Sequence, residues 1–135
     1  MIYIDTNVVI SYVDQLDQNH GKARRLLDTL NGDRVVSELT KVELASVFSR
    51  AGFEDPLALS LYSIRKVDAR IVNVDFNRVL VKAAEISHRL KLRTLDLLHI
   101  TLASLIGAQK LVTFDRDILS KSNLISKFGI EVIKT

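Results

Sequence analysis

Short runs of apolar, mostly β-branched residues alternate along the chain with longer stretches in which apolar residues recur at helical spacing. The short runs predict strands at residues 2–4, 34–36, 71–74, 110–113 and 131–133. The longer stretches predict helices at residues 8–16, 22–30, 40–50, 55–66, 76–90 and 95–106. Strands that alternate with helices are typical of parallel sheets with crossover helices. The pattern therefore predicts an α/β fold, a three-layer sandwich whose central parallel sheet is flanked by helices.

Residues typical of helix ends support these boundaries. Asp55 and Pro56 suit a helix start, because aspartate is a good cap and proline is tolerated in the first turn. Gly107 follows a helical stretch and predicts a left-handed cap. No repeat, linker or charge run divides the 135 residues, which suffice for one domain at roughly 100–200 residues each. We therefore expect a single domain over residues 1–135.

Composition removes several classes of protein. Hydrophobic residues make up 47% and charged residues 26%, close to the averages of globular domains, which argues against disorder. The absence of cysteine excludes disulfide frameworks, zinc ribbons, iron–sulfur sites and thiol nucleophiles, so any metal must be held by oxygen or by one of three histidines. The uncharged apolar stretch at residues 97–109 is too short to span a bilayer, and no basic, then apolar leader opens the chain. A cytoplasmic location is the expectation.

Four acids occupy positions where sites form in parallel sheets. Asp5 directly follows the first predicted strand, and Asp115 follows the fourth. Glu43 and Asp96 lie in the first turns of two predicted helices. Ligands of open parallel sheets bind beyond the carboxyl ends of the strands, where strand order reverses. We therefore expect the four carboxylates to converge there.

Each acid also has a purely structural interpretation. Thr40 and Glu43 have the spacing of a capping box, in which Glu43 would bond the backbone NH of Thr40. Asp96 could complement a helix dipole, and Asp115 could cap a short helix that begins near Arg116. These alternatives stay open for each residue, but four coincidences are less economical than one common cause.

Divalent metal binding is the common cause that we infer. Like charges a few ångströms apart repel by about 4 kcal/mol per pair at an effective dielectric near 20, so clustered carboxylates need a cation or a proton between them. Ligation by oxygen suits Mg²⁺ or Mn²⁺, which also bind water and substrate phosphate. Such a site hydrolyses phosphodiester bonds without a side-chain nucleophile.

Four segments resemble, in order and over essentially the whole chain, the motif blocks of the PIN-domain family. They are Ile4-Asp5-Thr6-Asn7-Val8, Ser37 with Thr40-x-x-Glu43, Leu95-Asp96-Leu97-Leu98-His99 and Val112-Thr113-Phe114-Asp115-Arg116-Asp117. The resemblance implies a metal-dependent ribonuclease fold with Asp5, Glu43, Asp96 and Asp115 as the acidic quartet. Small members of this family are similar to VapC-type toxins, which cut RNA, are often homodimers and are held inactive by an antitoxin. The resemblance therefore implies an RNA substrate, an antitoxin protein and a homodimer.

Five further residues are expected to support the quartet rather than to form it. His99 lies three residues after Asp96 on the same helix face, where it is interpreted as a packed or orienting histidine rather than a ligand. Asp117 matches a family position that sometimes assists the metal, but a helix-start role is favoured. Hydroxyl and amide groups that could orient ligands or water belong to Thr6, Asn7 and Thr113.

Charge is compatible with a polyanionic partner. The formal net charge is +3, and setting the four acids aside leaves 12 acids against 19 bases, a charge of +7 on the rest of the chain. Eight aromatic residues without tryptophan do not indicate a base-stacking platform, so backbone contacts should dominate. A set of apolar residues on two adjacent helices is interpreted as core, with an antitoxin groove as the alternative: Leu44, Val47, Phe48, Leu57, Leu61, Tyr62 and Ile64.

Three rival functions differ in the residues that they need. A haloacid-dehalogenase-type phosphatase needs a second aspartate where the chain has Asn7. A receiver domain needs an acidic pair near the first strand, but Thr6 follows Asp5. A non-catalytic PIN-like scaffold that binds RNA or a protein is the remaining alternative, against which the unsubstituted quartet argues.

Overall fold

A computed structural model describes residues 1–134 of the chain, and its centre is a five-stranded sheet. The strands are β1 (Ile2–Ile4), β2 (Arg34–Ser37), β3 (Ala69–Val72), β4 (Lys110–Val112) and β5 (Glu131–Ile133). Their order is β3-β2-β1-β4-β5, and every neighbouring pair is parallel. The chain runs outward from β1 to β3 and then crosses to β4 on the other side of β1. The strand order therefore reverses beside β1, where ligand sites form in such sheets.

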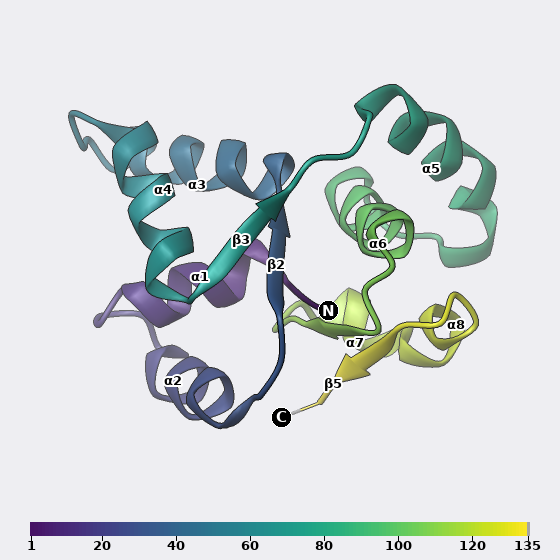
Figure 1. The fold of residues 1–135 in the computed structure, drawn as a ribbon, viewed down its shortest axis with the longest axis horizontal. Helices are drawn as coiled ribbons and strands as arrows, with labels where there is room; N and C mark the ends of the chain where they lie inside the picture. The colour runs from purple at the N-terminus through teal and green to yellow at the C-terminus, as the bar shows by residue number, and fades with distance from the viewer. Residues whose placement is uncertain (135) are drawn as a thin grey trace.

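Helices cover both faces of this sheet (Figure 1). On one side lie α1 (Thr6–Val13), α2 (His20–Thr29), α3 (Glu38–Arg50) and α4 (Pro56–Lys66). On the other lie α5 (Phe76–Leu90), α6 (Thr94–Ile106), α7 (Arg116–Ser120) and α8 (Ser122–Ser126). The predicted three-layer α/β sandwich is thus confirmed.

Two apolar cores follow from the alternation of side chains along the strands. Tyr3, Val35 and Leu111 point to the α5–α8 side, and all three are fully buried. Their neighbours Ile4, Val36 and Val112 point to the α1–α4 side and are equally buried. Successive strand residues face opposite sides of a sheet. Strands that are covered on both faces therefore have continuous apolar runs in their sequence.

Several predicted boundaries shift by two residues, and one helix was missed. α1 begins at Thr6 and α3 at Glu38, each two residues before its predicted start, because strand passes into helix without a loop. β3 spans Ala69–Val72 rather than residues 71–74, because these four residues pair with Arg34–Ser37 of β2. α8 was not predicted, and its five residues are too few for a clear helical period. Helix α5 and the left-handed Gly107 cap are as predicted.

The apolar residues of α4 correct one prediction. Leu57, Leu61 and Tyr62 were interpreted as core, but they are 53%, 44% and 57% exposed. The buried face of α4 carries Ser60 and Ile64 instead, and the Ser60 hydroxyl donates to the carbonyl of Lys41 on α3. A small serine at this contact lets the two helices pack closely and turns the large side chains outward.

Among residues 1–134, no helix combines the length and the apolar character needed to cross a membrane.

Candidate active site

The four predicted acids line one cleft of about 500 Å³. Asp5 follows β1 and Asp115 follows β4, the two strands at the point of reversal. Glu43 reaches the cleft from the second turn of α3, and Asp96 from the first turn of α6. The expected convergence at the carboxyl edge of the sheet is therefore present.

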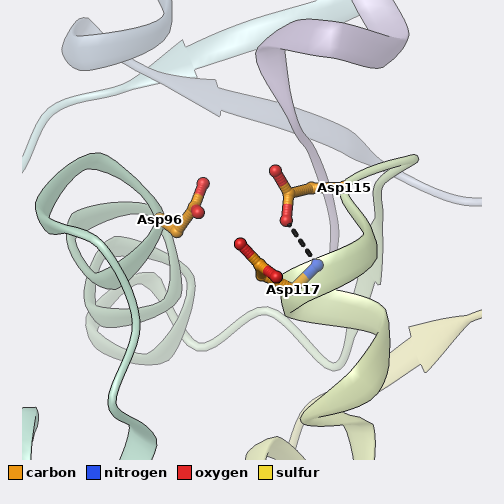
Figure 2. A group of neighbouring side chains, drawn as sticks. All are labelled: Asp96, Asp115 and Asp117. Carbon is orange, nitrogen blue, oxygen red and sulfur yellow. Dashed lines mark hydrogen bonds between the residues drawn. The ribbon is translucent and has the colours of Figure 1, made fainter.

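Three aspartates on one side of the cleft lie closest together. Asp96, Asp115 and Asp117 each offer a carboxylate oxygen, and these oxygens all lie within 4.8 Å of one another. Figure 2 shows the three carboxylates pointing toward one another, Asp96 from α6 and the others from the start of α7. Burial, with the charges of Asp115, Asp5 and Asp117, raises the pKa of Asp96 to about 6. This electrostatic strain is what a bound cation would relieve.

Asp115 and Asp117 occupy the start of α7 in different ways. Asp115 is the N-cap, and its Oδ1 accepts from the backbone NH groups of Asp117 (2.9 Å) and Ile118 (3.1 Å). Asp117 lies in the first turn, as expected for a helix-start residue, and is exposed. Its carboxylate nevertheless belongs to the close group of three, so its position at the helix start does not separate it from the candidate ligands.

Asp5 is held rigidly at the base of the cleft and is only 5% exposed. Its Oδ1 accepts from the backbone NH of Thr6 at 2.8 Å, and its Oδ2 accepts from the Thr113 hydroxyl at 2.7 Å. Burial raises the pKa of Asp5, against the lowering effect of His99 and these donors. Both oxygens are therefore oriented, one by the first residue of α1 and the other by the residue that follows β4.

Glu43 does not take part in a capping box. Helix α3 begins at Glu38 with Ser37 as its N-cap, so Thr40 is inside the helix, and its buried hydroxyl has no hydrogen-bond partner among residues 1–134. The Glu43 side chain instead turns toward the cleft, where Oε1 accepts from the Thr6 hydroxyl at 2.8 Å and from Nε2 of His99. The capping-box alternative is wrong because β2 leads straight into α3.

His99 is buried between two carboxylates. Nε2 hydrogen-bonds Oε1 of Glu43 and lies 3.8 Å from Oδ1 of Asp5. Burial alone would lower the pKa of His99, but the hydrogen bond to Glu43 and the nearby negative charges outweigh it and raise the pKa. The same contacts have the opposite effect on Glu43. Burial alone would raise the pKa of Glu43, but His99 lowers it below its ordinary value. The histidine thus stabilises the charged form of the glutamate.

The family model of the PIN domain matches residues 2–123. The chain belongs to the PIN domain family. Proteins of this family are typically nucleases and generally depend on a divalent metal. Membership disfavours the phosphatase and receiver alternatives, whose site residues the chain also lacks.

Solved structures of VapC-type toxins and toxin–antitoxin complexes share this PIN fold. VapC20 of Mycobacterium tuberculosis, described as a sarcin-ricin loop cleaving toxin, is similar with a TM-score of 0.72 and 20% identity over 89% of this chain and 94% of that one. VapBC2 of Rickettsia felis, bound to a promoter DNA fragment, has a TM-score of 0.68 at 18% identity over 99% and 100% of the two chains. FitAcB of Neisseria gonorrhoeae has a TM-score of 0.70 at 18% sequence identity, over 99% of this chain and 97% of that one. No curated protein sequence matches the chain.

The donor set of this PIN domain suits a hard divalent cation. The close group consists of carboxylate oxygens, the ligands that Mg²⁺ and Mn²⁺ favour. Three oxygens within 4.8 Å of one another could be drawn together by such an ion, which would supply Lewis acidity at this point of the cleft. Asp5 and Glu43 are not part of the close group found among residues 1–134. They lie beside His99 instead.

Two other residues expected to orient the site, Thr113 and Asn7, contact its acids or the loop that carries Asp115. The Thr113 hydroxyl donates to Asp5 and accepts from the backbone NH of Asp115 at 3.0 Å. Oδ1 of Asn7 accepts from the backbone NH of Phe114 at 3.3 Å, which ties α1 to the loop after β4. These bonds fix the loop that carries Asp115 against the start of α1.

Tyr3 and Ser37 were not predicted as site residues. The Tyr3 hydroxyl lies 2.7 Å from Nδ1 of His99 and 2.8 Å from Oγ of Ser37. Burial raises the pKa of Tyr3 far above its usual value, so the phenol stays protonated. One feature of the sequence points to Tyr3: it lies two residues before Asp5, and residues two apart along a strand face the same side.

A larger hollow elsewhere lacks such chemistry. It measures about 690 Å³, lies between α8 and β5, and has Glu131 as the one acid among its lining residues. A single carboxylate on an open surface does not make a metal site. The smaller cleft is therefore the candidate active site.

Proposed function

We propose that this protein is a divalent-metal-dependent endoribonuclease that hydrolyses phosphodiester bonds of RNA, with its PIN domain spanning residues 1–135. The convergence of Asp5, Glu43, Asp96 and Asp115 on one cleft carries the proposal. Family membership supports it, since PIN domains are typically nucleases.

Asp96 and Asp115 are the proposed principal ligands of Mg²⁺ or Mn²⁺, with Asp117 completing their close group. The cation supplies Lewis acidity, which activates water for attack and offsets charge on the phosphate. Asp5 and Glu43 add negative charge to the same cleft, in orientations fixed by Thr6, Thr113 and His99.

The wall of the cleft suits a strand of RNA. Helix α3 runs along it, and Val42, Ser46 and Arg50 recur at four-residue spacing on the lining face. Arg50 is the one arginine or lysine among the residues that line the cleft, and we propose that it binds a backbone phosphate. Attraction by the +7 charge outside the quartet supports the same substrate.

We also propose that the protein is the toxin of a toxin–antitoxin pair, acting in the cytoplasm as a homodimer. The similar structure VapBC2 of Rickettsia felis is such a complex, and this likeness supports an antitoxin partner. The exposed side chains of Leu57, Leu61 and Tyr62 on α4 offer an apolar surface for that partner.

Cleavage of a labelled single-stranded RNA by purified protein tests the enzymatic proposal. We expect no cleavage in EDTA, cleavage with Mg²⁺ or Mn²⁺, and at least about tenfold less cleavage by Asp115→Asn. Asp55→Asn is the matched control, because Asp55 caps α4 as Asp115 caps α7 and asparagine caps equally well. RNA binding without metal-dependent turnover would favour the non-catalytic scaffold instead.

A further inference from the structure

A row of buried polar side chains runs behind the cleft, formed by Ser37, Tyr3, His99 and Glu43. The Tyr3 hydroxyl contacts Oγ of Ser37 at 2.8 Å and Nδ1 of His99 at 2.7 Å, and Nε2 of His99 contacts Glu43. Tyr3 is fully buried and is not among the residues that line the cleft. Any effect of its hydroxyl on the cleft must therefore pass through His99.

The row joins elements from both sides of the sheet. Tyr3 lies in the middle of β1 and Ser37 at the end of β2, while His99 comes from α6 and Glu43 from α3. The rings of Tyr3 and His99 meet edge to face, with centroids 5.7 Å apart and planes at 63°. The imidazole is thus fixed by both packing and hydrogen bonding to the central strand.

The chemistry of the row orders the His99 ring. A carboxylate accepts hydrogen bonds, so Nε2, which faces Glu43, carries a proton. The Tyr3 hydroxyl can donate to Nδ1 or accept from it, because the Ser37 hydroxyl can take the complementary role. Without the phenol oxygen, Nδ1 would be buried without this partner, and the ring would lose one of the two bonds that set its orientation.

The consequence reaches Glu43. Its Oε1 takes both donors, Thr6 Oγ1 at 2.8 Å and His99 Nε2, while Oε2 has no hydrogen-bond partner among residues 1–134. The Glu43 side chain is about a quarter exposed and lines the cleft. Two donors on one oxygen leave the other available to the cleft.

We propose that Tyr3 is a positioning residue of the metal site: its hydroxyl fixes His99, which holds Oε1 of Glu43 and leaves Oε2 available to the cleft. This inference rests on the proposed metal-dependent function. A purely structural role for Tyr3 predicts a change in stability alone, whereas a positioning role predicts a change in metal affinity at equal folding.

The first measurement is made without metal. Long-range proton–nitrogen NMR spectra of the histidines, recorded at pH 7.5 in EDTA, should show one ordered His99 ring with its proton on Nε2 in the wild type. Tyr3→Phe keeps the ring of residue 3 and removes the hydroxyl, and we expect the His99 signals to broaden or to shift toward a tautomer mixture. Tyr12→Phe is the matched control, since it removes a phenol that donates to Asp28 on the outer helices, 3.0 Å away.

The second measurement is the Mn²⁺ dissociation constant by calorimetry, on protein shown to be folded by circular dichroism. We expect Tyr3→Phe to weaken Mn²⁺ binding about tenfold, the size typical of residues that orient metal ligands, and Tyr12→Phe to leave it unchanged. In a Glu43→Gln background, Tyr3→Phe should have little further effect, because the two substitutions act on one path.

Wild-type Mn²⁺ affinity in a folded Tyr3→Phe protein would overturn the inference, even if the His99 signals change. An undiminished effect in the Glu43→Gln background would overturn it as well, because Tyr3 would then act by another route. If the wild type itself binds no Mn²⁺ and cuts no RNA, the proposed function fails and the metal role of Tyr3 with it. The EDTA spectra separate that case, since they report on His99 independently of metal.

Discussion

Replacing Asp96 by asparagine is predicted to stabilise the metal-free protein. Asp96 faces Asp115 and Asp117, and its pKa is raised to about 6 from an ordinary value of 3.8, first by burial and then by these negative charges. Asparagine keeps the shape of the side chain and removes the charge. The substitution therefore removes an unfavourable interaction that a bound cation would offset in the proposed metal site.

The size of the effect follows from the shift in pKa. A difference of about 2 pKa units corresponds to about 3 kcal/mol at neutral pH, at 1.36 kcal/mol per unit. Asp96 is partly exposed, so solvent screening reduces this to about 1–2 kcal/mol. Asp96 also lies in the first turn of α6, where losing a negative charge costs about 0.3–1 kcal/mol. The net gain expected for Asp96→Asn is about 1 kcal/mol.

The sign of the pH dependence distinguishes this mechanism from a general gain in stability. Well below pH 3.8, Asp96 is protonated in both the folded and the unfolded chain, so its charge costs nothing. Between pH 4 and 6, the unfolded chain releases the proton first, and the wild type loses stability as the pH rises. The advantage of Asp96→Asn should therefore be small at pH 4 and complete above pH 7.

Urea unfolding in EDTA at pH 4 and pH 7.5, followed by circular dichroism, measures the effect. Glu38→Gln is the control, because Glu38 lies in the first turn of α3 and pairs with Lys41 rather than with other acids. It should lower stability by a few tenths of a kcal/mol. The reasoning fails if Asp96→Asn is less stable than the wild type at pH 7.5. It also fails if the gain in unfolding free energy is the same at both pH values, because the charge of Asp96 would then not be its source.

Three further predictions address the metal, Glu43 and Thr40. Mg²⁺ or Mn²⁺ at a hundredfold excess over its dissociation constant should stabilise the wild type by about 2.7 kcal/mol in thermal unfolding, and much less in Asp96→Asn/Asp115→Asn; equal shifts would place the ions elsewhere. Glu43→Gln should reduce RNA cleavage at least about tenfold while the protein stays folded, so near-normal rates would remove Glu43 from the mechanism. Thr40→Val replaces a buried hydroxyl that has no hydrogen-bond partner among residues 1–134 by a methyl group and should leave urea stability unchanged or higher; a loss of about 1 kcal/mol would instead indicate that this hydroxyl makes a stabilising hydrogen bond.

The positions of the acids were predictable because they depend on the ends of elements. Asp5 and Asp115 follow strands whose apolar runs are unambiguous, and Asp96 begins a strongly apolar helix. In a parallel sheet all such ends lie at one edge, so placing the strands also places the acids. The orientation of each side chain was not predictable in this way. Thr40 and Glu43 have capping-box spacing, yet α3 begins two residues earlier and Glu43 turns to the cleft.

The contacts that orient the site depend on long-range packing, which local pattern does not encode. In the sequence, Tyr3 looks like one more apolar residue of a buried strand. Its partners Ser37 and His99 lie 34 and 96 residues further along the chain. Only the sheet order, which sets β2 beside β1, together with the packing of α6 over the Tyr3 face, brings the three together. A phenol at this buried position must find hydrogen-bond partners, and those partners are the N-cap of α3 and the histidine one turn after Asp96. Satisfying one buried hydroxyl thereby couples the central strand to the two helices that carry Glu43 and Asp96.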